Sequence, residues 1–199
     1  MTNVNIFITI AKQIWSQQHG ESYIKKSISS AALLYRSAVT VLIEEDLQEC
    51  DNGMPLTKVD ITGVQIITEE NGTLTVNGTA RFDDEYGSPT MWKMYSKRLQ
   101  RGQWVTGLLS REIWNLCPVL LSPNELWYPL MVKMHKNRCP FPKGYEEHMN
   151  MVNLGNPAHY FKIPPDFIGE WQVYNEITTS RRGHPEKECF LIKLTITEV

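Results

Sequence analysis

The sequence contains no apolar run long enough to span a bilayer, no internal repeat and no low-complexity tract. It also lacks an excess of either charge: 20 basic and 22 acidic side chains leave a formal net charge of −2. Such a chain does not carry the electrostatic footprint of a nucleic-acid-binding protein, so we expect no nucleic-acid partner. The 199 residues, of which 42% are hydrophobic, fit one globular domain with a sizeable core plus an appendage.

Motifs of common enzyme classes are missing as well. The sequence has no G-x-S-x-G elbow, no H-E-x-x-H, no P-loop and no Rossmann glycine pattern. The acidic run at 83–85 is interpreted as a solvated turn at a strand end, rather than a calcium or acid–base site. The five histidines are scattered, and we interpret them as surface residues. We therefore predict a protein that is not an enzyme, with no catalytic residues, no metal site and no cofactor.

Cysteine is scarce, but its number is even. Cys50, Cys117, Cys139 and Cys189 include no C-x-x-C pair, and no histidine stands at metal-ligand spacing from them. Zinc binding and thioredoxin-like chemistry are therefore poor interpretations. The wide spacing fits two disulfides, for which three connectivities are possible, and disulfides indicate an extracellular or luminal compartment. Four buried free thiols are the alternative.

Two N-glycosylation acceptors, Asn71 and Asn77, stand close together in the stretch NGTLTVNGTARF. Residues 73–82 alternate between apolar and polar, which is the period of a half-buried strand. Asn77 is then expected to point to water, and Asn71 to lie in a turn at 69–72. Ordinary polar strand and turn residues are the alternative to glycosylation.

Strand patterns dominate the rest of the chain. We expect strands at 37–43, 59–67, 73–82, 91–99, 171–177 and 189–197. The second and third should form a hairpin, and Arg101-Gly102 should make a turn. In the last strand, four apolar residues should share one face: Phe190, Ile192, Leu194 and Ile196.

One segment has helical spacing instead. Ser110 can cap a helix over 110–117, Pro118 would discourage its continuation, and four apolar residues recur at the helical period: Leu109, Ile113, Leu116 and Leu120. A short helix inserted among short antiparallel strands predicts an all-β fold, a two-sheet antiparallel β-sandwich. The proline- and glycine-rich stretch 139–169 should be rich in loops.

The segment between Cys117 and Cys139 is irregular, with three prolines, yet strongly apolar. Loops are normally exposed and polar, so its composition calls for an explanation. One interpretation is a loop folded over the core. The other is a hydrophobic rim around a ligand cavity, because methionine and aromatic side chains adapt to an acyl chain.

The order of several segments resembles a known family. CPFPKGYEEH (139–148), FKIPPDFIGEWQVYNEI (161–177) and ECFLIKLTI (188–196) follow one another as at the end of the GM2-activator and MD-2-related lipid-recognition proteins. A Tyr-x-x-x-Val strand leading to Cys50, the Asn-Gly-Thr strand and RGQW at 101–104 extend the likeness. The whole pattern, from Tyr35 to Val199, looks most like the insect chemosensory protein A and B families. Gln172 departs from it, since relatives often have arginine there.

The resemblance implies a cup-like, immunoglobulin-like sandwich with disulfides Cys50–Cys189 and Cys117–Cys139. It also implies a secreted, monomeric, non-enzymatic carrier or presenter of a lipid or hydrophobic semiochemical in insect chemosensation, with a membrane receptor as a further partner. The alternative is a secreted, disulfide-bonded β-sandwich that binds a protein partner and has a filled core without lipid.

For a carrier, we expect an apolar cavity. Its lining comes from the expected helix face and from strand residues turned inward: Trp104, Leu109, Ile113, Phe161, Phe167 and Trp171. Its mouth comes from the apolar loop: Leu126, Trp127, Tyr128 and Met131.

Residues 1–34 precede the resemblance and are expected to be an N-terminal extension or defective leader, poorly ordered or a single helix. Ile6, Ile10 and Ile14 recur at helical spacing, but the stretch 25–34 is too short and too polar to work as a signal peptide. The cysteines, the acceptor sites and the resemblance nevertheless favour secretion of a domain at 35–199.

Overall fold

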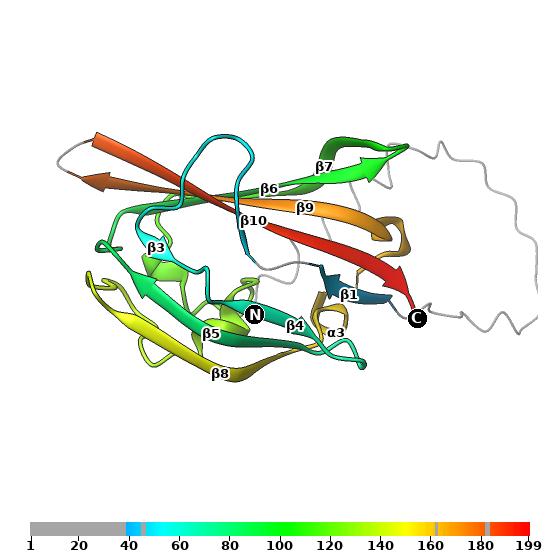
Figure 1. Cartoon of the computed structure of the whole chain (residues 1–199), viewed down its shortest axis with the longest axis horizontal. Coiled ribbons are helices and arrows are strands. Elements are labelled where there is room, and N and C mark those ends of the chain that lie inside the picture. Colours follow the sequence, from blue (N-terminus) through cyan, green and yellow to red (C-terminus); the bar gives the residue numbers. More distant parts are fainter. Residues whose placement is uncertain (1–38, 45–46, 162, 182–183) are drawn as a thin grey trace, which may run out of the picture. The chain divides into compact units, whose positions relative to one another are not determined.

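The computed structural model describes residues 39–44, 47–161, 163–181 and 184–199, so the expected N-terminal extension lies outside the described residues. Two antiparallel sheets form two layers (Figure 1). The prediction of an all-β sandwich is confirmed. No helix in the described part of the chain is long and apolar enough to cross a membrane.

The first sheet, sheet A, carries the longest strands. Its order is β1 (Val39–Ile43), β10 (His184–Glu198), β9 (Gly169–Arg181), β6 (Thr90–Gln100) and β7 (Gln103–Ile113), and β2 (Gln48–Glu49) also pairs with β10. The β6–β7 hairpin turns at Arg101-Gly102 as predicted, with φ angles of 52° and 78°. The long β9–β10 hairpin lies in the middle of the sheet, where its alternating apolar residues can face two different surroundings.

The second sheet, sheet B, is shorter. Its strands are β3 (Val59–Asp60), β4 (Gln65–Thr68), β5 (Leu74–Phe82) and β8 (Glu146–Gly155), with β5 pairing to all three others. The predicted hairpin forms between β4 and β5, but the expected strand over 59–67 is interrupted. Asp60 Oδ1 accepts hydrogen bonds from the backbone N–H (3.0 Å) and the hydroxyl (2.6 Å) of Thr62, which turns the chain before β4 begins.

Strand β5 departs from the strict alternation that its sequence suggests. Irregularities in its pairing with β8 fall between Leu74 and Thr75 and between Val76 and Gly78. Thr75 is consequently buried, with its hydroxyl donating to Glu69 Oε1 at 2.9 Å, although we expected it on the polar side. Gly78 has φ 120°, and a Cβ there would lie 1.9 Å from the Gly63 carbonyl oxygen, so only glycine fits.

The helix expected over 110–117 is wrong. This segment ends strand β7, where Ile113 lies opposite Trp92 and Ser110 opposite Tyr95. The spacing of four between Leu109 and Ile113 is even, so it fits the two-residue period of a strand as well as a helix, and pairing with β6 decides the outcome. Short helical segments lie elsewhere: η1 (Cys117–Val119), α2 (Tyr128–Met131), α3 (Pro157–Phe161) and η2 (Pro165–Phe167).

Two disulfides join the four cysteines, in the pairing that the resemblance implies. Cys50–Cys189 has a Cα–Cα distance of 5.5 Å and ties the segment after β2 to strand β10. Cys117–Cys139 has a Cα–Cα distance of 5.6 Å and closes the base of the apolar loop.

Candidate ligand-binding site

One face of each sheet is apolar, and these faces look toward each other. On sheet A, Trp92, Met94 and Val173 are buried, and further apolar residues pack against them: Leu109, Ile113, Leu116, Trp127, Ile177, Ile192 and Leu194. On sheet B, Val64, Val76 and Met149 are buried with their own neighbours: Leu47, Ile61, Ile66, Ala80, Leu130, Val152 and Leu154. Within the described ranges the two clusters share no residue.

The sheets meet through a third cluster, at one end of the sandwich. It is built on Tyr86, Leu120, Met131 and Phe141, and it includes Val59 and Phe82 of sheet B and Ile177 of sheet A. Phe82 stacks on Phe141 with ring centroids 5.0 Å apart. The aromatic rings close this end, and farther along residues of the apolar loop pack on both faces, Trp127 on the sheet A cluster and Leu130 on the sheet B cluster.

A buried carboxylate ties the sheets together at the same end. Glu188 of β10 accepts hydrogen bonds from the backbone N–H of Thr57 (2.7 Å), the backbone N–H of Lys58 and the Tyr86 hydroxyl. Burial and this hydrogen bond to Glu188 raise the pKa of Tyr86 above its usual value. The chain just before β3 is thereby fixed to the inner side of sheet A.

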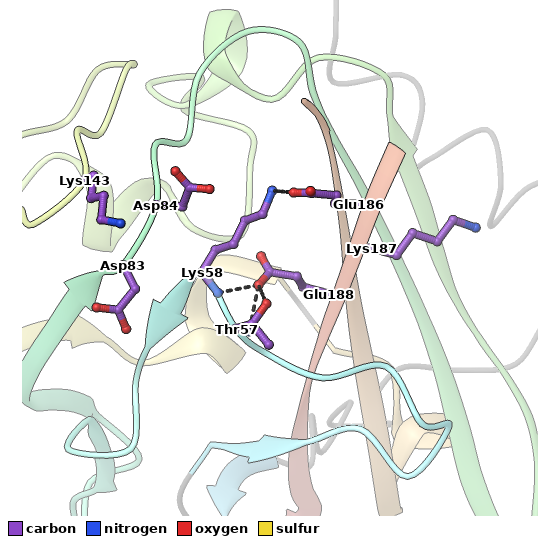
Figure 2. Close-up of a pocket in the computed structure, with 8 residues that line it drawn as sticks. All are labelled: Thr57, Lys58, Asp83, Asp84, Lys143, Glu186, Lys187 and Glu188. Carbon is purple, nitrogen blue, oxygen red and sulfur yellow. Dashed lines mark hydrogen bonds and ion pairs between the residues drawn. The ribbon is translucent and has the colours of Figure 1, made fainter. Parts of the chain in front are cut away.

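Figure 2 shows the hollow beside this carboxylate, where Lys58 reaches toward Glu186 while Glu188 turns to the backbone of Thr57 and Lys58. Its volume is about 400 Å³, and polar and charged side chains line it: Thr57, Lys58, Asp83, Asp84, Lys143, Glu186, Lys187 and Glu188. The Lys58 ammonium is paired with Glu186 and also donates to the Thr179 hydroxyl. This hollow is therefore a charged surface feature, different from the apolar cavity that we expected.

In the middle of strand β10, the inner face is less covered than the outer face. Cys189 and Leu191, on the outer face, are 0% and 3% exposed. Phe190, Ile192 and Leu194, on the face toward sheet B, are only half-buried although β10 lies inside the sheet. The inner face of β10 is thus incompletely covered at these three residues, between the buried Glu188 and Ile196.

The apolar loop folds inward at its centre. Trp127 packs edge-on against Trp92, with centroids 4.8 Å apart, and its indole N–H donates to the Leu120 carbonyl at 3.1 Å. Arg111 of β7 forms an ion pair with the buried Glu125. Of the expected mouth residues, Trp127 and Met131 lie in the core, Tyr128 is half-buried and Leu126 is exposed.

The expected lining residues fall into three groups. Leu109 and Ile113 belong to the sheet A cluster beside Trp127. Phe167 stacks on Trp171, with centroids 5.4 Å apart, in a separate cluster with Val39, Val41 and Ile196. Trp104 and Phe161 are 41% and 43% exposed and belong to no apolar cluster of the described residues, so they do not lie with the others.

Sequence reasoning missed the sheet B side of the interior. Val76 and Met149 face sheet A, yet neither was expected in the lining. The alternation of β5 did place Val76 on its apolar side, whereas Met149 belongs to β8, which lies in the stretch expected to be loops. On sheet A, the alternation of β10 had already indicated Ile192 and Leu194 as one face.

Another buried carboxylate fastens the end of the apolar loop to sheet B. Glu147 of β8 accepts hydrogen bonds from the backbone N–H of His135 (3.0 Å) and from the Tyr145 hydroxyl. Burial alone would raise the pKa of Glu147, but the hydrogen bonds from Tyr145, His135 and Lys136 outweigh it and lower this pKa. Burial and the bond to Glu147 raise the pKa of Tyr145 to about 12.

The two glycosylation acceptors differ in exposure. Asn71 is exposed in the predicted turn, which is closed by a 2.8 Å hydrogen bond from Gly72 N–H to the Glu69 carbonyl. Asn77 is half-buried, with Met151 N–H 3.4 Å from its Oδ1, so it is less open to water than expected. Glycosylation of either residue stays a prediction.

Comparison with models of known protein families finds no match, and no curated protein matches the sequence significantly. In the part of the chain that the structure describes, no group of three or more His, Cys, Asp or Glu residues could hold a metal ion. What the fold and the site define is a two-disulfide β-sandwich whose apolar inner face is only partly covered at Phe190, Ile192 and Leu194.

Proposed function

We propose that this protein is a secreted, non-enzymatic carrier of a lipid or another hydrophobic small molecule, held between the two sheets. The observation that carries this proposal is the burial of strand β10. Phe190, Ile192 and Leu194, which face sheet B, are half-buried, while Cys189 and Leu191 on the opposite face are 0% and 3% exposed. Ile196, farther along the inner face, is 4% exposed and closes that end. Apolar residues that face an interior without filling it are what a ligand with a hydrocarbon chain can cover.

The energetics of such binding are sufficient without a charged anchor. Enclosing a chain of about fourteen methylenes gains about 11 kcal/mol, at about 0.8 kcal/mol for each CH₂ group. Immobilisation of the ligand removes several kcal/mol of this gain. A remainder of about 8 kcal/mol corresponds to a dissociation constant of about 1 μM.

The resemblance to the insect chemosensory protein A and B families supports a narrower form of the proposal. The ligand would then be a semiochemical, and the loaded protein, as a monomer, would present it to a membrane receptor. The two disulfides support secretion, because such bonds persist in oxidising compartments.

Binding of a fluorescent fatty-acid probe tests the carrier proposal. Ile192→Trp places a large side chain in the space between the sheets and should abolish uptake of the probe. Thr178→Trp is the matched control, since it places the same side chain on the outer face of the neighbouring strand β9 and should leave uptake unchanged. If the parent takes up no probe, or if both variants behave alike, the carrier proposal is wrong. The alternative of a β-sandwich with a filled core that binds a protein partner is then favoured.

Expression behind a working secretion signal tests the compartment. The secreted protein should contain no free thiol under denaturing, non-reducing conditions and should carry glycans that are lost stepwise in Asn71→Gln and Asn77→Gln. Four reactive thiols in the secreted material would contradict this part of the proposal.

A further inference from the structure

Asn175, an amide, is one of several buried polar side chains on the largely apolar inner face of sheet A. Asn175 of β9 lies between Met94 of β6 and Phe190 of β10, directly opposite both in the strand register. Along its own strand, the residues on the same face are Val173 and Ile177, which pack in the sheet A cluster. Asn175 is only 5% exposed, so its amide stands among apolar side chains inside the sandwich.

The amide is only partly satisfied by the protein. Its Nδ2 donates to the Val173 carbonyl at 3.2 Å, and the amide orientation follows from this contact, because a carbonyl can only accept. Among the described residues, Oδ1 has no hydrogen-bond donor. No side-chain nitrogen or oxygen of these residues is both sealed from solvent and unpartnered, so Oδ1 keeps some accessible surface.

The other buried polar side chains of this face differ from Asn175. Ser96 both donates to the Leu109 carbonyl (3.2 Å) and accepts from the Leu109 N–H (3.1 Å). Thr90 donates to the Gly87 carbonyl, Thr179 accepts from Lys58, and Glu188 has the donors described above. Each of these has a structural partner for its oxygen, whereas the Asn175 oxygen has none within the described ranges.

Placing an amide in apolar surroundings is unfavourable unless its polar atoms are hydrogen-bonded. A valine or threonine would suit a strand at this position better than asparagine. A ligand with a hydrogen-bond donor next to Oδ1 would offset the free-energy cost of burying this amide. A plain hydrocarbon, an ester or an ether has no donor, but a hydroxyl does.

We infer that Asn175 is the residue that recognises the polar group of the ligand, and that the ligand is a hydrocarbon chain bearing a hydroxyl. This inference rests on the proposed carrier function. The hydroxyl donates its proton to Asn175 Oδ1, and the chain lies along the half-buried side chains of β10. Selectivity then comes from one neutral hydrogen bond inside an apolar site, where a ligand without a donor leaves the amide unsatisfied.

The test uses displacement of the apolar probe N-phenyl-1-naphthylamine by two competitors of equal length, dodecan-1-ol and its donor-free isomer 1-methoxyundecane. The parent should bind the alcohol roughly five- to tenfold more tightly than the ether, the range expected for one buried hydrogen bond. Asn175→Val should bind the two competitors equally, with undiminished affinity for the ether. Asn175→Thr, which has the shape of valine but keeps a hydroxyl, should retain part of the preference for the alcohol.

The outcomes separate this inference from the carrier proposal. If neither competitor displaces the probe from the parent, the carrier function itself fails. If the parent binds both competitors with equal affinity, or if Asn175→Val keeps the preference of the parent, the role of Asn175 is overturned while the carrier function stands. Retained affinity for the ether shows that a variant still has an intact site.

Discussion

In the middle of strand β10, at residues 189–192, the two faces are covered in the reverse of the order that a filled sandwich requires. The residues turned toward sheet B should be the most buried, because the core lies between the sheets. Here Leu191 and Cys189 on the outer face are buried, while Ile192 and Leu194 on the inner face are only half-buried. The difference shows that part of the packing that stabilises the fold lies outside the sandwich.

The outer cover is built from the segment after β2 and from aromatic side chains. Cys50 and Met54 pack against Tyr174, Cys189 and Leu191. The rings of Tyr95 and Tyr174 stack with centroids 4.9 Å apart, and the Lys97 ammonium donates to the Tyr174 hydroxyl at 2.9 Å. Packing here stabilises the fold independently of how the inner face is covered.

Removal of the Cys50–Cys189 disulfide, on the outer face, should lower the free energy of unfolding more than any other change proposed below. Removing Cys50–Cys189 by a double change to alanine should lower the free energy of unfolding by about 5 kcal/mol, and removing Cys117–Cys139 by about 3.5 kcal/mol, because the closed loops differ in length. Guanidinium unfolding of both variants measures this. If the loss of unfolding free energy is smaller for Cys50–Cys189 than for Cys117–Cys139, the disulfide on the outer face is not the more stabilising of the two.

Truncation of neighbouring residues on β10 compares the faces directly. Leu191→Ala should cost about 3 kcal/mol of unfolding free energy, as expected for a fully buried leucine. Ile192→Ala should cost only about 1 kcal/mol, because the half-buried side chain loses less contact. Urea unfolding of the two variants gives both values. An equal or greater loss for Ile192→Ala would mean that the inner face is packed as a normal core.

On sheet B, the buried carboxylate of Glu147 should make a smaller contribution to the free energy of unfolding, and one that depends on pH. The lowered pKa of Glu147 stabilises the fold above the pKa of the unfolded chain, about 4.3, and this stabilisation is lost as the pH falls through the folded value. At pH 7, Glu147→Gln should cost about 2 kcal/mol. The difference from the parent should shrink as the pH falls below about 4.

The control for this prediction is the neighbouring Glu146→Gln, which changes an exposed carboxylate on the opposite face of β8. It should alter the unfolding free energy by less than about 0.5 kcal/mol. Urea unfolding at pH 7, 5, 4 and 3 follows all three proteins. A loss for Glu147→Gln that stays constant over this range would show that its charge is not what fastens the loop.

Some of the fold follows from local pattern, and some does not. Strands β6, β9 and β10 were predicted because their alternation extends over many residues. Strand β8 was missed, because it lies in the stretch expected to be loops and its alternation changes phase between Met151 and Val152, where the pairing with β5 is irregular. The segment around Leu109 and Ile113 has a spacing common to both helix and strand, so its neighbours in space had to decide.

The candidate site divides in the same way. The loop between the bridged cysteines was recognised as unusual from its composition, but Trp127 and Leu126 differ in where they point, which depends on the contact with Trp92. Trp104 was expected inside because it is large and apolar. It lies exposed on edge strand β7, since its register partner Leu99 belongs to the outer face.

The sequence by itself determined that the chain is built of antiparallel strands, that β10 has two unlike faces and that four cysteines are available to staple it. Alternation can do this because it depends only on neighbours along the chain. Only the tertiary structure decided that Cys189 and Leu191 are more deeply buried than Ile192 and Leu194, and that Asn175 stands among Met94, Phe190 and Val173. Burial and isolation of a polar group are set by residues far apart in sequence, which meet only when the strands align.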